Sequence, residues 1–186
     1  MKNLIFLFFM ITSVSFINAQ EVKSAFLTKM EVNWMNTEIS DLQQTYTVIE
    51  KALAEKDGID VGRNKTEIIK SITSLSSNSN IFYTKIMLWI DNEERANQRI
   101  SDGPSTYNYD NRKKDGKSQE IVISQSDLQK FKSNLDALIK IKETLKATKY
   151  ALHPQQENAL ANLKLVAEFL EIARLNNTII QNSLRD

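Results

Sequence analysis

Histidine is the side chain that most often serves as a metal ligand or general base, and this chain has a single one, His153. It precedes Pro154 in a predicted turn, and no acid or nucleophile motif accompanies it. Di-metal carboxylate sites in helical proteins need Glu-x-x-His pairs on two facing helices, which a single histidine excludes. We therefore interpret His153 as a helix cap or a bystander and predict no metal site.

Carboxylates and tyrosines are the other groups that an acid–base enzyme would have to use. Glu93 and Glu94 are adjacent, so on a helix they point apart, and nearby arginines, one of them Arg99, are placed to neutralise them. A solvated charged face is the ordinary interpretation of such a cluster. Together with Tyr107 and Tyr109, these residues form the single cluster that an unusual enzyme could use, and we predict that the protein is not an enzyme.

Cysteine is absent, which excludes disulfides, thiol catalysis, thiolate metal sites and a lipid anchor on an N-terminal cysteine. The four glycines form no phosphate-binding pattern, so no nucleotide cofactor is predicted. The segments around Gly58 and Gly116 have a superficial likeness to calcium loops. In the second segment Lys113 and Val122 would occupy ligand positions, and in the first Asn64 would replace the bidentate glutamate, so both are rejected.

The N-terminus has the form of a bacterial secretory signal. Lys2 is followed by an apolar run at residues 4–17, and Ala19 supplies the small residue before a cleavage point. We predict that residues 1–19 are a signal peptide cleaved before Gln20; the alternative is an uncleaved anchor, although a spanning helix needs about 20 apolar residues. No second apolar run follows, so residues 20–186 are predicted to be a single domain without a membrane span.

The charge of the mature chain is balanced. The sequence has 24 basic and 23 acidic residues, and Lys2 is the one charged residue of the predicted signal. Without the signal the basic and acidic residues balance, so the domain has no net charge that would attract nucleic acid or an anionic membrane. The expected partner is therefore another envelope protein or a second copy. A tyrosine- and cation-rich stretch supplies candidate loop contacts, namely Tyr107, Tyr109, Arg112, Lys113 and Lys114.

Apolar residues at alternating steps of three and four predict two long helices in the first half of the chain. The first covers about residues 22–56 and ends at Asp57-Gly58. The second covers about residues 65–101 and keeps its register through the Ser/Asn-rich segment 76–80. Two shorter helices with a break in that segment are the alternative.

Two further helices are predicted in the second half. Ser126 with Gln129 has the form of a capping box, and the helix that follows is expected to stop at His153-Pro154. Pro154 suits the first position of a fourth helix that continues to about Leu184. Because the turns within each pair are short, the predicted fold class is all-α, an antiparallel four-helix bundle with long helices.

The connection between the two helix pairs, residues 102–120, is rich in Gly, Pro, Ser, Asn and charge. Loops of this length usually have a function or are disordered. Residues 106–110 (TYNYD) and 119–123 (QEIVI) have a pattern that allows a short β-hairpin around Asp115-Gly116, within the 102–123 connection.

Large apolar and aromatic side chains gather at one level of the first two helices. Counting from a pivot near residue 60 places Trp34 level with Ile86, one turn from Trp89, with Met30 and Phe82 close by. One interpretation is the thick middle of the core, enclosed by the third and fourth helices. The other is a partner-binding face or an apolar pocket.

The function predicted from these features is that of an exported, non-enzymatic helical-bundle protein of the bacterial envelope, secreted or periplasmic, which acts by protein–protein interaction or as a structural component. The alternative is a periplasmic bundle that binds or senses an apolar small ligand in a pocket lined by residues of the Trp34 level. An exposed apolar patch would favour the first hypothesis, and a closed surface with an open interior the second.

Overall fold

The computed structural model describes residues 22–57, 59–97 and 118–185, and the side chains of all of these except 22–26, 29, 89–97 and 118. In this part of the chain there are four helices and a small three-stranded antiparallel sheet. The helices are α1 (Lys29–Glu55), α2 (Val61–Asn97), α4 (Gln125–Ala147) and α5 (Ala159–Ser183), and the strands are β1 (Val22–Thr28), β2 (Ser118–Ser124) and β3 (Leu184–Arg185). The mostly helical class predicted from the sequence is confirmed.

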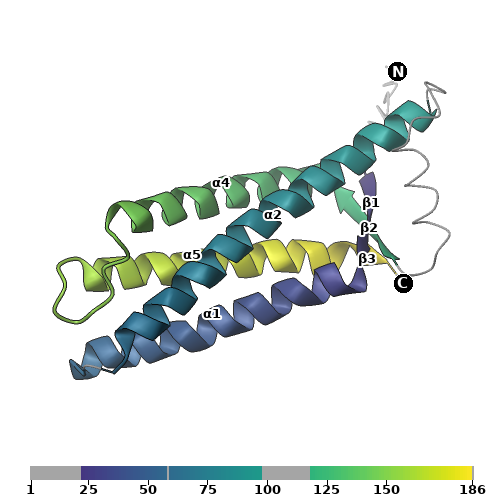
Figure 1. Ribbon diagram of the computed structural model, residues 1–186. Coiled ribbons are helices and arrows are strands. Elements are labelled where there is room, and N and C mark those ends of the chain that lie inside the picture. The colour runs from purple at the N-terminus through teal and green to yellow at the C-terminus, as the bar shows by residue number, and fades with distance from the viewer. Residues whose placement is uncertain (1–21, 58, 98–117, 186) are drawn as a thin grey trace, which may run out of the picture.

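The helices lie lengthwise beside one another, with the sheet across one end (Figure 1). α1 packs against α2 and α5, and α4 packs against α5 and α2. Both α1 and α4 run away from the sheet, and α2 and α5 return toward it (Figure 1). We call the two ends of the molecule the sheet end and the turn end.

The sheet joins parts of the chain that are far apart in sequence. β2 pairs with β1 along its whole length, from Val22 opposite Ser124 to Thr28 opposite Ser118. On its other edge β2 pairs with β3 at Glu120 and Ile121. The predicted strand at 119–123 therefore exists, but its partners are β1 and β3; residues 106–110, the partner predicted for the hairpin, lie outside the described residues.

Two apolar clusters form the core of the described part. The sheet-end cluster combines strands with all four helices, and it consists of Leu27, Val32, Met35, Phe82, Ile86, Ile121, Ile123, Leu128, Phe131 and Ile180. The turn-end cluster lies between the four helices farther from the sheet, and its largest fully buried side chain is Phe169. Core aromatic rings also meet between α2 and α4, where Tyr83 stacks on Phe131 with centroids 6.5 Å apart.

The start of the first helix was predicted wrongly, because residues 22–28 form β1. The apolar steps at Val22 and Phe26 also fit a helix, so local periodicity favoured one. The boundary is instead set by a capping box, in which the Thr28 hydroxyl accepts from the Glu31 N–H at 3.2 Å and the Glu31 carboxylate accepts from the Thr28 N–H at 2.8 Å. The sequence Thr-x-x-Glu before an apolar run was the signal that indicated this start.

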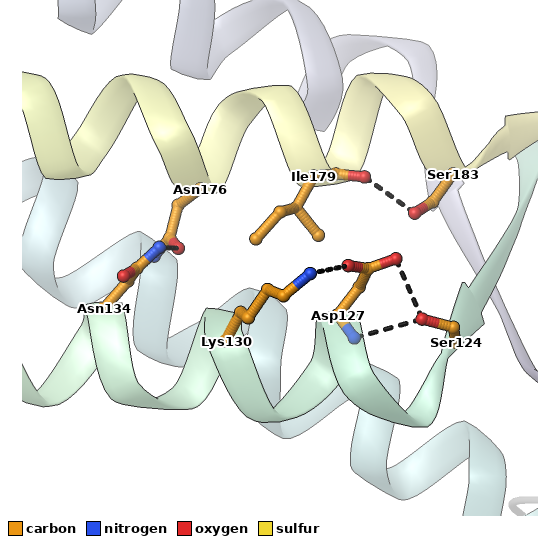
Figure 2. A network of polar contacts seen from close by, with 7 residues as sticks. All are labelled: Ser124, Asp127, Lys130, Asn134, Asn176, Ile179 and Ser183. Atoms are coloured by element: carbon orange, nitrogen blue, oxygen red, sulfur yellow. Dashed lines mark hydrogen bonds and ion pairs between the residues drawn. The ribbon is translucent and has the colours of Figure 1, made fainter. Parts of the chain in front are cut away.

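Other boundaries also differ from the prediction. The cap of α4 is Ser124 with Asp127, rather than Ser126 with Gln129, and Figure 2 shows the Ser124 hydroxyl between the backbone and carboxylate of Asp127. α5 begins at Ala159 rather than at Pro154, because residues 153–158 form turns.

The second helix is continuous, which confirms the favoured interpretation of the Ser/Asn-rich segment. The hydroxyl of Ser76 donates to the carbonyl of Ile72 at 2.7 Å, so this buried side chain is satisfied without breaking the helix. α2 begins at Val61, four residues before the predicted start; residues 98–101 of the predicted helix lie outside the described residues.

We expect Thr28→Ala to lower the free energy of unfolding by about 1 kcal/mol, because it removes the side-chain oxygen that caps α1. The measurement is urea unfolding followed by circular dichroism. Thr47→Ala is the matched control, since the exposed Thr47 hydroxyl caps no helix end and bonds only within its own helix, to the carbonyl and the side-chain amide of Gln43. Equal effects of the two substitutions would contradict the assigned cap.

The N-cap of α4 predicts a dependence on pH. The hydrogen bond from the Ser124 hydroxyl, followed by the contact with Lys130, lowers the pKa of Asp127 below its ordinary value of 3.8. The stabilisation is therefore fully present above pH 3.8 and is lost as the pH falls through the lower pKa of the folded state. We expect the difference in unfolding free energy between wild type and Asp127→Asn to shrink on acidification below that value; Asp136→Asn controls for the loss of one carboxylate from the same helix.

Candidate functional site

A groove with apolar walls opens between α1 and α2 near the sheet end. Its volume is about 320 Å³. We call it the Trp34 groove, and it is lined by Met30, Glu31, Trp34, Asn78, Ile81 and Phe82. Four of these six side chains are large and apolar, so the groove is suited to apolar side chains or acyl groups rather than to charged ligands.

The groove has a buried floor and exposed walls. Phe82 is 3% exposed and belongs to the sheet-end cluster, and Trp34 packs half-buried against that cluster. Met30 is 78% exposed and Ile81 is 47% exposed. Leu88, two turns beyond Ile81 on α2, is 51% exposed as well. Exposed large apolar side chains that gather around a hollow mark interaction surfaces more often than singly scattered ones do.

The charged group on the rim of the groove is already engaged. The carboxylate of Glu31 belongs to the cap of α1 and forms an ion pair with Lys85 across the α1–α2 interface. This contact links α1 to α2 and neutralises the charge of the Glu31 carboxylate. Two turns farther along α1, Glu38 accepts from the Ser74 hydroxyl at 3.4 Å, and burial raises the pKa of Glu38 above its ordinary 4.5. The one charged residue among the described residues that line the groove is therefore paired, and the groove has little net charge.

These interhelical contacts correct the predicted level of Trp34. The sequence placed Trp34 opposite Ile86, whereas in the structure it shares the groove with Asn78, Ile81 and Phe82, about one turn nearer to the α1–α2 turn. The reason is that α2 begins at Val61 rather than at 65, which moves the pivot of the helix pair toward its first helix.

The structure divides the predicted site residues into three groups. Met30, Trp34 and Phe82 meet at the groove. Ile86 is fully buried in the sheet-end cluster, so it supports the floor from inside. The side chain of Trp89 lies outside the described residues, as do all five candidate loop contacts.

The core interpretation of the Trp34 level holds for its inner side, and the open-face interpretation holds for its outer side. Its inner side is core, closed by Phe131 from α4, Ile180 from α5 and the strand residues Ile121 and Ile123. Its outer side is the open groove. Sequence reasoning missed Glu31, Asn78 and Ile81 as lining residues. The run 81–90 is apolar nearly all round, so its composition did not single out Ile81.

Two other hollows are present in the described part of the chain. The larger, about 730 Å³, lies between α1 and the start of α5, and Tyr46, Glu50 and Lys164 are among its lining residues. The Tyr46 hydroxyl donates to Glu50 at 2.9 Å, and burial together with that contact raises the pKa of Tyr46. Its lining mixes exposed charges with small apolar residues, and no group of reactive side chains converges there.

His153 lines the smaller hollow at the turn end, with Lys56 and Asp57. Its Nδ1 accepts from the Gln155 N–H at 3.3 Å, and the Gln156 side chain accepts from the backbone N–H groups of Leu152 and His153 at 3.0 Å. These bonds are those of a turn, and the helix-cap interpretation of His153 is wrong, because α4 ends at its cap Thr148 and the N-cap of α5 is Asn158. Among the described residues no group of three or more His, Asp or Glu is placed to hold a metal ion.

Searched over the same described residues, no helix combines the length and apolar character needed to cross a membrane. No family model, no curated protein and no solved structure matches the chain. The chemistry of the Trp34 groove is therefore the basis for assigning a function.

The exposure of Met30 and Ile81 predicts that these two walls of the groove contribute little to folding. We expect Met30→Ser and Ile81→Ser each to change the free energy of unfolding by no more than about 0.5 kcal/mol, since both side chains stay in contact with water. Phe82→Ala should lower it by roughly 3 to 5 kcal/mol, because it leaves a cavity in the sheet-end cluster. Chemical unfolding of the three variants measures this contrast, and large losses for the serine variants would show the walls to be core.

Proposed function

We propose that this chain is an exported, non-enzymatic protein of the bacterial envelope that folds as an antiparallel four-helix bundle and binds another protein through the Trp34 groove. The observation that carries the proposal is the exposure of Met30 and Ile81 around an open apolar groove whose floor, Phe82, is buried. Such a surface loses contact with water when a partner inserts apolar side chains, and this is the main source of binding free energy in protein interfaces.

The composition of the groove supports a protein partner. Tryptophan is enriched among the residues that dominate binding energy, and Trp34 lies half-buried with large apolar side chains on either side. The Glu31–Lys85 ion pair leaves the rim neutral, which matches the balanced charge of the mature chain. An apolar helix face of another envelope protein is the partner that fits these properties.

Export is supported by the N-terminal sequence. The apolar run at residues 4–17 follows Lys2 and precedes Ala19, in the order of a secretory signal. β1 begins at Val22, after the proposed cleavage point before Gln20, so cleavage would leave the strand and its pairing with β2 intact. We also propose the candidate loop contacts at residues 107–114 as a second contact region, because this stretch is rich in tyrosine and in cationic side chains.

Binding of an apolar small molecule is the alternative function. The groove volume of about 320 Å³ lies at the lower end of the range for ligand pockets, roughly 300 to 1,000 Å³. A groove open along one side buries less of a small ligand than a closed pocket does, and this favours the protein partner.

Site-specific photocrosslinking in the native host tests the proposal. With a photoreactive phenylalanine at Ile81, we expect a discrete adduct with one envelope or secreted protein, whereas the same group at the exposed Glu67, toward the other end of α2, should give none. Adding Met30→Ser should reduce the adduct at least tenfold, the effect of about 1.4 kcal/mol of binding free energy.

Absence of a position-dependent adduct would overturn the protein-binding proposal. The small-ligand alternative is then tested with Trp89→Phe, in which Trp34 is the single tryptophan. Saturable quenching or a shift of Trp34 fluorescence by a medium-chain fatty acid, lost in Ile81→Ser, would support the alternative.

A further inference from the structure

A layer of polar side chains crosses the interior between the two apolar clusters. Asn134 Nδ2 on α4 donates to Asn176 Oδ1 on α5 at 2.9 Å, as Figure 2 shows. On the neighbouring residue of α5, Asn177 Nδ2 donates to Asn36 Oδ1 on α1 at 2.6 Å. α2 contributes Ser79, which is 1% exposed and belongs to neither cluster. The interior part of this layer therefore comes from α2, α4 and α5, and on the side of α1 the layer ends at the exposed Asn36.

The register of the helices places these residues at one level. Tyr83 on α2 stacks on Phe131 on α4. Ser79 lies one turn before Tyr83, and Asn134 lies about one turn after Phe131, so in this antiparallel pair Ser79 is level with Asn134. The hydrogen bond between Asn134 and Asn176 extends the same level to α5.

The layer contains buried hydrogen-bonding atoms that lack a partner. Ser79 Oγ, Asn176 Nδ2 and Asn177 Oδ1 are all buried, and none of the described residues forms a hydrogen bond with them. They are three of the four such atoms in the described part of the chain; the fourth is the Tyr150 hydroxyl. Asn176 itself is fully buried. Buried polar atoms in native proteins are almost always paired with protein or with ordered water, so this grouping at one level points to a ligand.

We propose that the polar layer is a hydration site, in which at least one long-lived water molecule bridges Ser79 Oγ and Asn176 Nδ2. The three atoms together offer a hydroxyl that donates or accepts, an amide donor and a carbonyl acceptor. Water matches this set because it donates two hydrogen bonds and accepts two, and internal water typically makes about three bonds to otherwise unsatisfied groups. A charged or apolar ligand would leave at least one of the three atoms unsatisfied.

Nuclear Overhauser measurements between water and side-chain amides of the mature protein test the site. Asn162 is the internal control, because it is equally buried but its Nδ2 donates to the Ala151 carbonyl at 3.0 Å and its Oδ1 accepts from the Thr148 hydroxyl at 3.0 Å. We expect the Asn176 amide protons to show cross-peaks to water with NOE and ROE of opposite sign, and the Asn162 amide to show none. Absence of the Asn176 peaks would overturn the proposal.

Oxygen-17 relaxation dispersion gives a second readout that counts water oxygens and is insensitive to exchange of the Ser79 hydroxyl proton. We expect the double variant Ser79→Ala, Asn176→Leu to hold at least one fewer long-lived water than the wild type, with its fold checked by circular dichroism. Equal dispersion in the two proteins would overturn the proposal. If the double variant does not fold, the wild-type measurement on Asn176 and Asn162 still decides.

Discussion

The pairing of β1 with β2 determines where the helices begin. Each strand leads directly into a helix, β1 into α1 and β2 into α4. Because the strands are antiparallel and pair over seven residues, α1 leaves from the end of the ribbon at Thr28 and α4 from the opposite end at Ser124. At about 3.3 Å per residue these two points are separated by roughly 20 Å. The paired strands therefore separate the starts of α1 and α4, and α2 and α5 pack between these two helices (Figure 1).

Because the paired strands lie at one end of the molecule, the cores of the two ends differ in composition. The sheet-end cluster lies under the strands and includes aromatic rings such as Phe82 and Phe131. The turn-end cluster, farther from the strands, is largely aliphatic. Near the sheet end α1 and α2 keep an uncovered apolar side, which is the Trp34 groove.

The amino-acid sequence alone was sufficient to predict the helix interiors, but it was not sufficient to predict how the strands pair. Alternating steps of three and four along α1, α2, α4 and α5 are local signals, and they predicted a helix in each of these places. Several ends were wrong: the first helix begins at Lys29 rather than at 22, and the third ends at Ala147 rather than at His153. The partner of Thr28 is Ser118, which is far away along the chain, so no local pattern indicates that pairing. The Thr28–Glu31 capping box, in contrast, was present in the sequence and marks the boundary between strand and helix.

The candidate site follows the same division. The apolar content of α1 and α2 identified Met30, Trp34 and Phe82 without any alignment, because aromatic residues at helical spacing reveal a face. Which of them face solvent depends on the offset between the helices, and that offset is fixed by the Glu31–Lys85 ion pair and by the start of α2 at Val61. A difference of about one turn decides that Ile81 and Phe82, rather than Ile86, share the groove with Trp34.

The position of the groove relative to the polar layer separates folding from binding. The Asn134–Asn176 hydrogen bond favours one alignment of α4 with α5, since a shifted register would leave the buried Asn176 side-chain carbonyl without its donor. Phe82 stabilises the fold from beneath the groove, while Met30 and Ile81 stay in contact with water. Met30 and Ile81 can therefore be altered while the core beneath the groove is unchanged. Trp34, Phe82 and Glu31, in contrast, line the groove and also hold the helices in place.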